Sequence, residues 1–163
     1  ADAFTYTSPV MRFPEPKRGL EGKFSVRHNL AAALLDKKIV IETHTDEKVK
    51  DPKMREAWQK VHTHVMTKWD PRFASGEAGG NPVTITMKDG RVLSKTVTSH
   101  DRKGSPGNRI SNEELIAKFR QNARLSLPEK VVETAVDQWL SLENIADVSQ
   151  AVKPLAGGTA RRA

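Results

Sequence analysis

The sequence contains no cysteine, which excludes disulfides, thiolate metal ligands and thiol catalysis. Its longest uninterrupted apolar run, Leu30 to Leu35, is far shorter than the roughly 20 residues that a membrane-spanning helix needs. The N-terminus lacks the basic and apolar regions of a secretory signal. These absences are compatible with a reducing compartment, and we expect a cytoplasmic protein.

Aromatic residues are scarce, at 6% with one tyrosine, whereas the net charge is +7. A basic protein suggests nucleic-acid binding. The lysines between residues 48 and 53 alternate with acidic residues, however, which is typical of a solvated helix face. No motif combines aromatic and basic residues for base stacking. A basic nucleic-acid binder is therefore the least favoured alternative.

The remaining composition is that of a globular protein. Hydrophobic residues make up 37% of the 163 residues and charged residues 29%, which argues against disorder. This length suffices for one domain with a core, or for a domain with a helical appendage.

The segment from Gly19 to Asp36 is rich in alanine and leucine, which favour helices. One apolar face contains Val26, Leu30, Ala33 and Leu34, and a second contains Phe24, Ala31 and Leu35. A helix that is apolar nearly all round is usually buried. The pattern therefore predicts a central helix whose middle, around Leu30, is the most buried segment of the chain.

Several segments alternate between apolar and polar residues, which is typical of half-buried strands. They are residues 61–69, 83–87 and 91–98. Residues 4–13 also predict a strand from their Thr, Tyr, Val and Phe content, and Pro9 confines it to an edge or a bulge. Asp89-Gly90 predicts a hairpin between residues 83–87 and 91–98. A three-residue loop with left-handed Gly90 would pair Leu93 with the Ile85 face, whereas a two-residue turn would align Val92 with Met87. We favour the first register.

The last third of the sequence predicts helices. Ser111 with Glu114, and Ser126 with Glu129, have the spacing of capping boxes, and a last short helix contains Ile145, Val148 and Val152. The predicted fold class is α+β, with a small antiparallel sheet covered by helices on one face and followed by C-terminal helices.

The run Gly19–Ser25, followed by His28 and Ala31–Asp36, resembles a signature of the MmgE/PrpD family. Later segments occur in the order seen in that family: Thr45-Asp46-Glu47, Asp51-Pro52, Lys88–Arg91 and Ser111–Arg120. The resemblance extends from about Ser8 to Leu155. Members are much longer, so the chain resembles only their C-terminal part.

The resemblance implies a cofactor-free lyase or isomerase that acts on small di- or tricarboxylates. The family includes 2-methylcitrate dehydratases of propionate metabolism, cis-aconitate decarboxylases and iminodisuccinate epimerases. Residues 1–125 would form a lid-like α+β domain, residues 126–155 helices that return to a separate helical domain, and residues 156–163 a flexible tail. The implied partners are the carboxylate substrate and that helical domain, through which a homodimer would form. The chain alone is expected to be inactive.

His28 is the candidate catalytic residue. Many relatives have tyrosine at the aligned position, where the side chain lines the active-site cleft, and imidazole can donate a hydrogen bond or exchange a proton near neutral pH. The alternative is a core histidine with one satisfied hydrogen bond. Lys23, Ser25 and Arg27 are candidate substrate-binding residues, since basic side chains bind carboxylates. For Lys23 and Arg27 the alternative is a solvated cation.

The other histidines give no comparable signal. His62 and His64 share one strand face, but a metal site needs a third ligand, and the spacing supplies none. His44 and His100 fall in loops without an evident partner. We therefore predict no metal. A second function class stays open: a stand-alone interaction domain that binds a helical partner.

Overall fold

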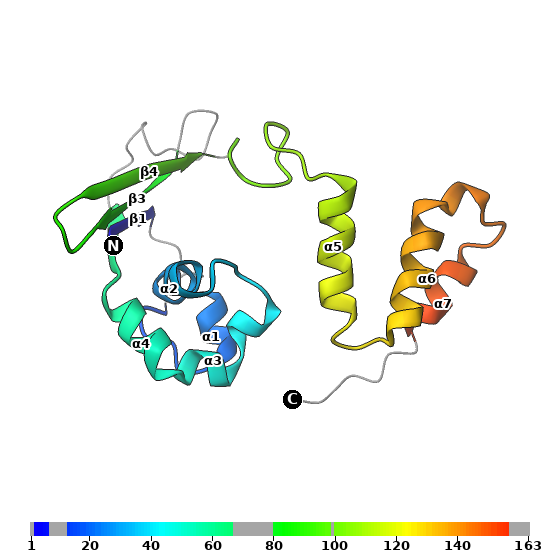
Figure 1. The fold of residues 1–163 in the computed structure, drawn as a ribbon, viewed down its shortest axis with the longest axis horizontal. Helices are drawn as coiled ribbons and strands as arrows, with labels where there is room; N and C mark the ends of the chain where they lie inside the picture. The colour runs from blue at the N-terminus through cyan, green and yellow to red at the C-terminus, as the bar shows by residue number, and fades with distance from the viewer. Residues whose placement is uncertain (1, 7–12, 67–79, 99, 157–163) are drawn as a thin grey trace. The chain divides into compact units, whose positions relative to one another are not determined.

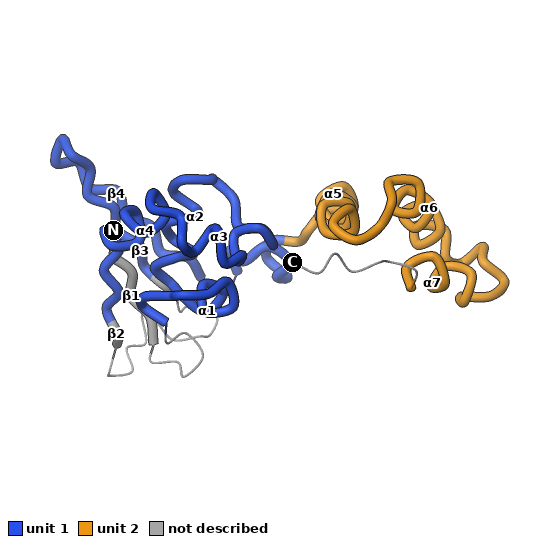
Figure 2. Tube along the Cα trace, turned by 90° about the horizontal axis from the view of Figure 1, so that it is seen from below, with its two compact units in different colours: residues 1–108 blue, residues 109–163 orange. Residues whose placement is uncertain are grey.

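The computed structural model of the chain describes residues 2–6, 13–66, 80–98 and 100–156. They form helices and one four-stranded sheet, which confirms the α+β class. The chain divides into two compact units, residues 1–108 and 109–163, coloured separately in Figure 2. The predicted boundary at residue 125 differs from this division, because α5 packs with the helix that follows it.

The secondary-structure elements are as follows. The first unit contains β1 (Asp2–Tyr6), α1 (Gly19–Lys23), α2 (Val26–Asp36), the 3-10 helix η1 (Ile41–His44), α3 (Asp46–Lys50), α4 (Pro52–Gln59), β2 (His62–Met66), β3 (Gly80–Thr86) and β4 (Val92–Thr98). The second unit contains α5 (Asn112–Ala123), α6 (Glu129–Leu140), the 3-10 helix η3 (Leu142–Asn144) and α7 (Ser149–Ala156).

The sheet has the strand order β2-β1-β3-β4, with α1 to α4 gathered on one side of it (Figure 1). Strands β1 and β2 are parallel, whereas β3 pairs antiparallel with both of its neighbours. The antiparallel pairing that the sequence predicts is therefore present, and the parallel pairing of β1 with β2 adds to it. All four helices lie in the connection between β1 and β2, and a long helical connection returns a strand in the parallel direction.

The hairpin of β3 and β4 has the favoured register. Ile85 is opposite Leu93 and Thr86 is opposite Val92. The Met87 amide donates to the Arg91 carbonyl at 2.8 Å, which leaves three residues in the loop. Gly90 has a φ of +85°, the left-handed conformation that glycine adopts at little cost.

The predicted central helix begins later than its composition suggested. Residues 19–36 form two helices, and Ser25 lies between them as the N-cap of α2. Its hydroxyl oxygen accepts a hydrogen bond from the His28 amide at 3.3 Å. A serine at this position satisfies a free amide of the first turn, and this ends α1 and starts α2.

The core of the first unit lies between α2 and α4. Ala31, Ala32, Met54 and Trp58 are at most 3% exposed and pack together. Leu30 is only half-buried, and Leu34 and Leu35 are 38% and 48% exposed. The prediction that α2 is buried all round was therefore wrong: in the described chain its alanine face is buried and its C-terminal leucines are accessible.

The second unit consists of helices whose contacts are partly ionic. The capping box of Ser111 and Glu114 is confirmed at the start of α5. The one predicted at Ser126 and Glu129 is wrong, because Pro128 is the N-cap of α6 and Glu129 pairs with Arg124. The Arg120 Nε donates to Glu133 Oε1 at 2.9 Å, which joins α5 to α6.

Candidate functional site

His28 lies in the first turn of α2 and is fully buried. Its Nε2 is 2.7 Å from the carbonyl oxygen of Thr43, a residue that is itself buried. A carbonyl can only accept, so Nε2 carries the proton. Nδ1 is then an acceptor, and it has no hydrogen-bond partner among the described residues. In this conformation, His28 has the surroundings of a core histidine with one hydrogen bond.

Two small residues allow the His28 ring to be buried. Ser25 caps α2 and is 0% exposed, so its hydroxyl is not accessible from solvent. A Cβ at Gly22 would lie 2.7 Å from Val49 Cγ2 and 3.2 Å from His28 Cδ2. The backbone of α1 therefore approaches Val49 too closely for a larger residue to fit without a shift, and it also lies close to the His28 ring.

Lys23 and Arg27 differ in their accessibility. Lys23, the last residue of α1, is exposed. Arg27 is half-buried in the first turn of α2, and its Nε is buried without a hydrogen-bond partner among the described residues. The start of a helix carries a partial positive charge that disfavours cations, so an arginine at this position is better accommodated when an anion is close.

A second polar contact lies beside the His28 hydrogen bond. Asn29 Oδ1 is 2.9 Å from His44 Nε2, and the His28 and His44 ring centroids are 6.1 Å apart. The expectation that His44 has no partner was therefore wrong. No pattern in the sequence indicates this pair, because residues 29 and 44 belong to different elements with no shared periodicity.

The pKa of His44 is lowered below its ordinary value. The main cause is partial burial, which disfavours the charged imidazolium, and electrostatic interactions with His28 and Lys23 lower the pKa further. A lower pKa keeps His44 neutral at physiological pH, with one ring nitrogen able to accept a proton.

The remaining histidines do not build a site in the described part of the chain. His62 and His64 are exposed on β2, and His100 is exposed in the loop after β4. Among the described residues, no group of three or more His, Asp or Glu side chains could hold a metal ion.

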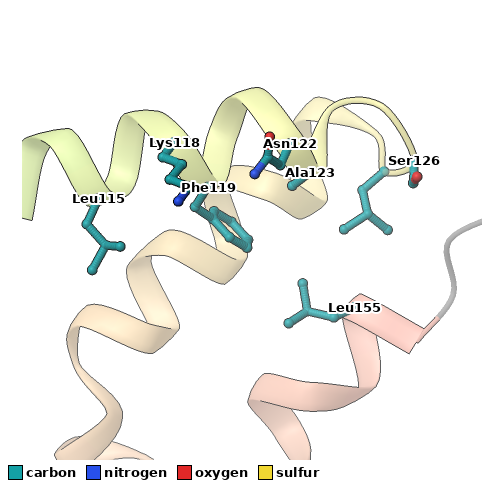
Figure 3. Close-up of a pocket in the computed structure, with 8 residues that line it drawn as sticks. Leu115, Lys118, Phe119, Asn122, Ala123, Ser126 and Leu155 are labelled. Atoms are coloured by element: carbon teal, nitrogen blue, oxygen red, sulfur yellow. The ribbon is translucent and has the colours of Figure 1, made fainter. Parts of the chain in front are cut away.

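The second unit contains a hollow among its helices. One part, of about 580 Å³, is lined by residues that Figure 3 shows projecting from α5 and α7, among them Phe119, Lys118 and Leu155. A neighbouring part of about 500 Å³ shares Phe119 and Leu155 and adds the α6 side chains Val136 and Trp139. Trp139 is 45% exposed. We call these two parts together the α5–α7 groove.

The chain belongs to the MmgE/PrpD family. The family model described as MmgE/PrpD C-terminal domain matches residues 2–142, which confirms the resemblance found in the sequence. Every helix within the described ranges is too short or too polar to cross a membrane.

Two curated relatives carry the name cis-aconitate decarboxylase. That of Mus musculus is 30% identical over 147 residues, which is 88% of this chain and 28% of the relative. That of Homo sapiens is 29% identical over 147 residues, again 88% of this chain and 29% of the relative. The chain thus spans less than a third of the length of either relative.

Proposed function

We propose that this chain is the lid portion of a lyase or isomerase that acts on small di- or tricarboxylates, with cis-aconitate decarboxylation as the leading reaction. The observation that carries this proposal is the alignment of 88% of the chain with proteins named cis-aconitate decarboxylase. Dehydration of 2-methylcitrate and epimerisation of iminodisuccinate are the alternatives within the same family.

The chemistry of these reactions requires a positioned proton donor or acceptor. Decarboxylation releases carbon dioxide and leaves an electron pair on carbon, which a proton must then neutralise. Dehydration removes a proton and a hydroxide, and epimerisation removes and returns a proton. None of these overall changes transfers electrons to or from an external acceptor. We propose that the lid excludes water and adds one or two side chains to the cleft.

In this proposal, the candidate residues of α1 and α2 have separate roles. Lys23 and Arg27 bind substrate carboxylates, and the chain's net charge of +7 favours anionic ligands. Ser25 supports the start of α2, and a direct contact with substrate requires α1 to move away from it. His28 remains the proposed proton donor or hydrogen-bond donor, which likewise requires release of its Nε2 from the Thr43 carbonyl.

The exposed apolar residues of the α5–α7 groove support a helical domain as the proposed partner. Its apolar residues Trp139 and Leu140 are 45% and 56% exposed, and exposed apolar patches commonly mark interfaces. We propose that these helices pack against the helical domain of the same enzyme, that this domain supplies most acid and base groups, and that it forms the homodimer. The proposed location is the cytoplasm.

The test is an assay of the chain with and without the helical domain of its own enzyme. We expect the complete enzyme to consume cis-aconitate with release of carbon dioxide, or 2-methylcitrate or iminodisuccinate instead, and the isolated chain to consume none. A complete enzyme that consumes no carboxylate would contradict the proposal. Activity of the isolated chain would show that the chemistry does not need the helical domain.

A second candidate function is a stand-alone interaction domain. The specific observation in its favour is the same accessible apolar groove, which would bind a helix of another protein. The two candidates differ in one measurable way. An interaction domain should bind its partner with no carboxylate turnover in the complex, whereas the enzyme part should restore turnover when it is combined with the helical domain.

A further inference from the structure

Asn29 determines the orientation of the His44 ring. Its Nδ2 donates to the carbonyl oxygen of Ser25 at 2.8 Å and also lies 3.3 Å from that of Lys23. The amide nitrogen of Asn29 therefore points at backbone carbonyls, and its oxygen must be the atom that faces His44 Nε2. An amide oxygen only accepts, so the neutral His44 ring carries its proton on Nε2.

This tautomer leaves His44 Nδ1 as the free ring nitrogen. No hydrogen bond to Nδ1 is present within the described residues, and the ring is half-buried rather than enclosed. His28 differs in both respects, since it is 0% exposed and its Nε2 is bonded to Thr43. Of the two histidines, only His44 can meet a ligand without rearrangement of the unit.

Among the basic side chains of the first unit, Lys23 of α1 acts on the His44 ring. Electrostatic effects on it come from His28 and Lys23, and both disfavour its protonation. Two acidic side chains of the neighbouring helices have other partners: Glu21 of α1 accepts from the Lys17 amide at 2.7 Å, and Asp46 of α3 accepts from the Gly19 amide at 2.8 Å. Glu42 of η1 and Glu47 of α3 are exposed. Asp36 of α2 pairs with Lys48 at 2.8 Å.

We propose that His44 and Lys23 form a carboxylate-binding site on the first unit, in which Asn29 is a positioning residue that orients the His44 ring. This inference rests on the proposed function for the class of ligand, a small polycarboxylate. A carboxylate placed between the two side chains accepts from the ammonium of Lys23 and from Nδ1–H of protonated His44. Binding therefore takes up a proton at His44 without any covalent change.

The first experiment uses the chain with ¹⁵N-labelled histidine and citrate as the probe. NMR spectra of the ring nitrogens should show the Nε2–H tautomer for His44, and citrate should raise its apparent pKa relative to sodium chloride of equal ionic strength. His44→Gln assigns the resonance and keeps a donor for Asn29 while removing the titrating nitrogen. No effect of citrate on His44 beyond that of chloride overturns the proposal.

Matched variants distinguish citrate binding at a specific site from a general effect of net charge. Lys23→Met should weaken citrate binding roughly tenfold, the effect expected for loss of a hydrogen bond to a charged group. Lys53→Met removes the same charge from exposed α4 and should leave binding unchanged. Equal weakening by both variants overturns the site, because it would indicate a non-specific charge effect. Asn29→Leu should produce a mixture of His44 tautomers, and an unchanged tautomer would refute its positioning role.

Failure of this inference is distinguishable from failure of the proposed function. In the complete enzyme, His44→Leu should raise KM for the carboxylate substrate about tenfold or more. If the unmodified enzyme consumes carboxylates and His44→Leu leaves KM and kcat unchanged, the site is refuted and the proposed function stands. If the enzyme consumes none while citrate still titrates His44 in the chain, the site stands and the proposed function fails.

Discussion

The Nε2 of His28 donates to the carbonyl oxygen of Thr43 at 2.7 Å, across a separation of 15 residues in sequence. The adjacent pair, Asn29 and His44, has the same separation and a distance of 2.9 Å. Two consecutive side chains of α2 therefore bind two consecutive residues of η1. This double contact holds η1 against α2. Of the two histidines involved, His28 is buried and His44 is half-buried.

His28→Ala should destabilise the chain by about 1–3 kcal/mol, because the buried Thr43 carbonyl loses its donor, and lost packing adds to this. His100→Ala is the control, since His100 is exposed and its loss should change stability by less than about half a kcal/mol. Urea unfolding measures both. Equal, small effects of the two variants would mean that the Thr43 contact does not stabilise the fold.

Kinetics of His28→Phe in the complete enzyme separate the catalytic role of His28 from the structural one. A proton donor should lose about 10²–10⁴ in turnover, whereas a residue that only orients substrate should lose less, mainly in affinity. The assay covers 2-methylcitrate, cis-aconitate and iminodisuccinate. Unchanged kinetics with reduced thermal stability would assign His28 to the core alone.

The two alanines that face the core should tolerate no larger side chain. Ala32→Leu should cost about 1–3 kcal/mol, because Ala32 is 0% exposed and packs against α4, where extra volume forces strain. Ala33→Leu is a matched control on the same helix, since Ala33 is exposed, and it should change stability by less than about half a kcal/mol. Chemical denaturation of the two variants measures the difference. Equal losses of stability in the two variants would show that α2 buries the Ala33 side as well as the Ala32 side.

Two local signals were read correctly from the sequence, whereas the long-range contacts were not. The hairpin register follows from Gly90 and from the period of two on either side of it, and the start of α5 follows from Ser111 and Glu114. These features depend on neighbours within a few residues. The parallel pairing of β1 with β2 depends on how the whole helical connection packs, which no local pattern encodes.

The candidate site was likewise predicted only in part. The segment containing Lys23, Ser25 and His28 was found through its resemblance to a family signature. The role of Ser25 as an N-cap was missed because its position within an alanine-rich and leucine-rich segment favoured one continuous helix. The Asn29–His44 contact was missed because it joins two elements, and the exposure of Leu34 and Leu35 was missed because both apolar faces were assigned to the core.

Gly22→Ala should be destabilising although alanine is the better helix former by about 1 kcal/mol. The added Cβ would lie 2.7 Å from Val49 Cγ2, and Val49 is fully buried with a stiff side chain. Crowding of this kind costs about 1–3 kcal/mol. Adding Val49→Ala removes the clash, so the double variant should be more stable than the sum of the single effects by about 0.5–3 kcal/mol. Additivity within error in thermal or urea unfolding would contradict this contact.

The lowered pKa of His44 predicts how stability depends on pH. Burial, His28 and Lys23 hold this pKa below 6.5 in the folded chain, so the unfolded state binds the proton more tightly. The contribution of His44 to the free energy of unfolding is fully present above pH 6.5, and it is lost as the pH falls through the pKa of the folded state. His44→Gln should flatten the stability profile in this range, and His100→Gln should not. Identical profiles for His44→Gln and the unmodified chain would contradict the shift.

Amides of the second unit should exchange with solvent faster than those of α2 and α4. Within the described chain, α5 has no fully buried residue, and Leu115 on it is 54% exposed, so few apolar contacts oppose local opening. Hydrogen exchange of the chain alone gives the comparison, and addition of the helical domain should slow exchange in α5, α6 and α7 if the groove is its docking surface. Trp139→Glu should remove this protection. Val92→Glu on β4, where Val92 is 61% exposed, is the control and should leave it intact. Slow exchange throughout the second unit of the isolated chain, with light scattering that shows a monomer, would mean that these helices are stable without a partner.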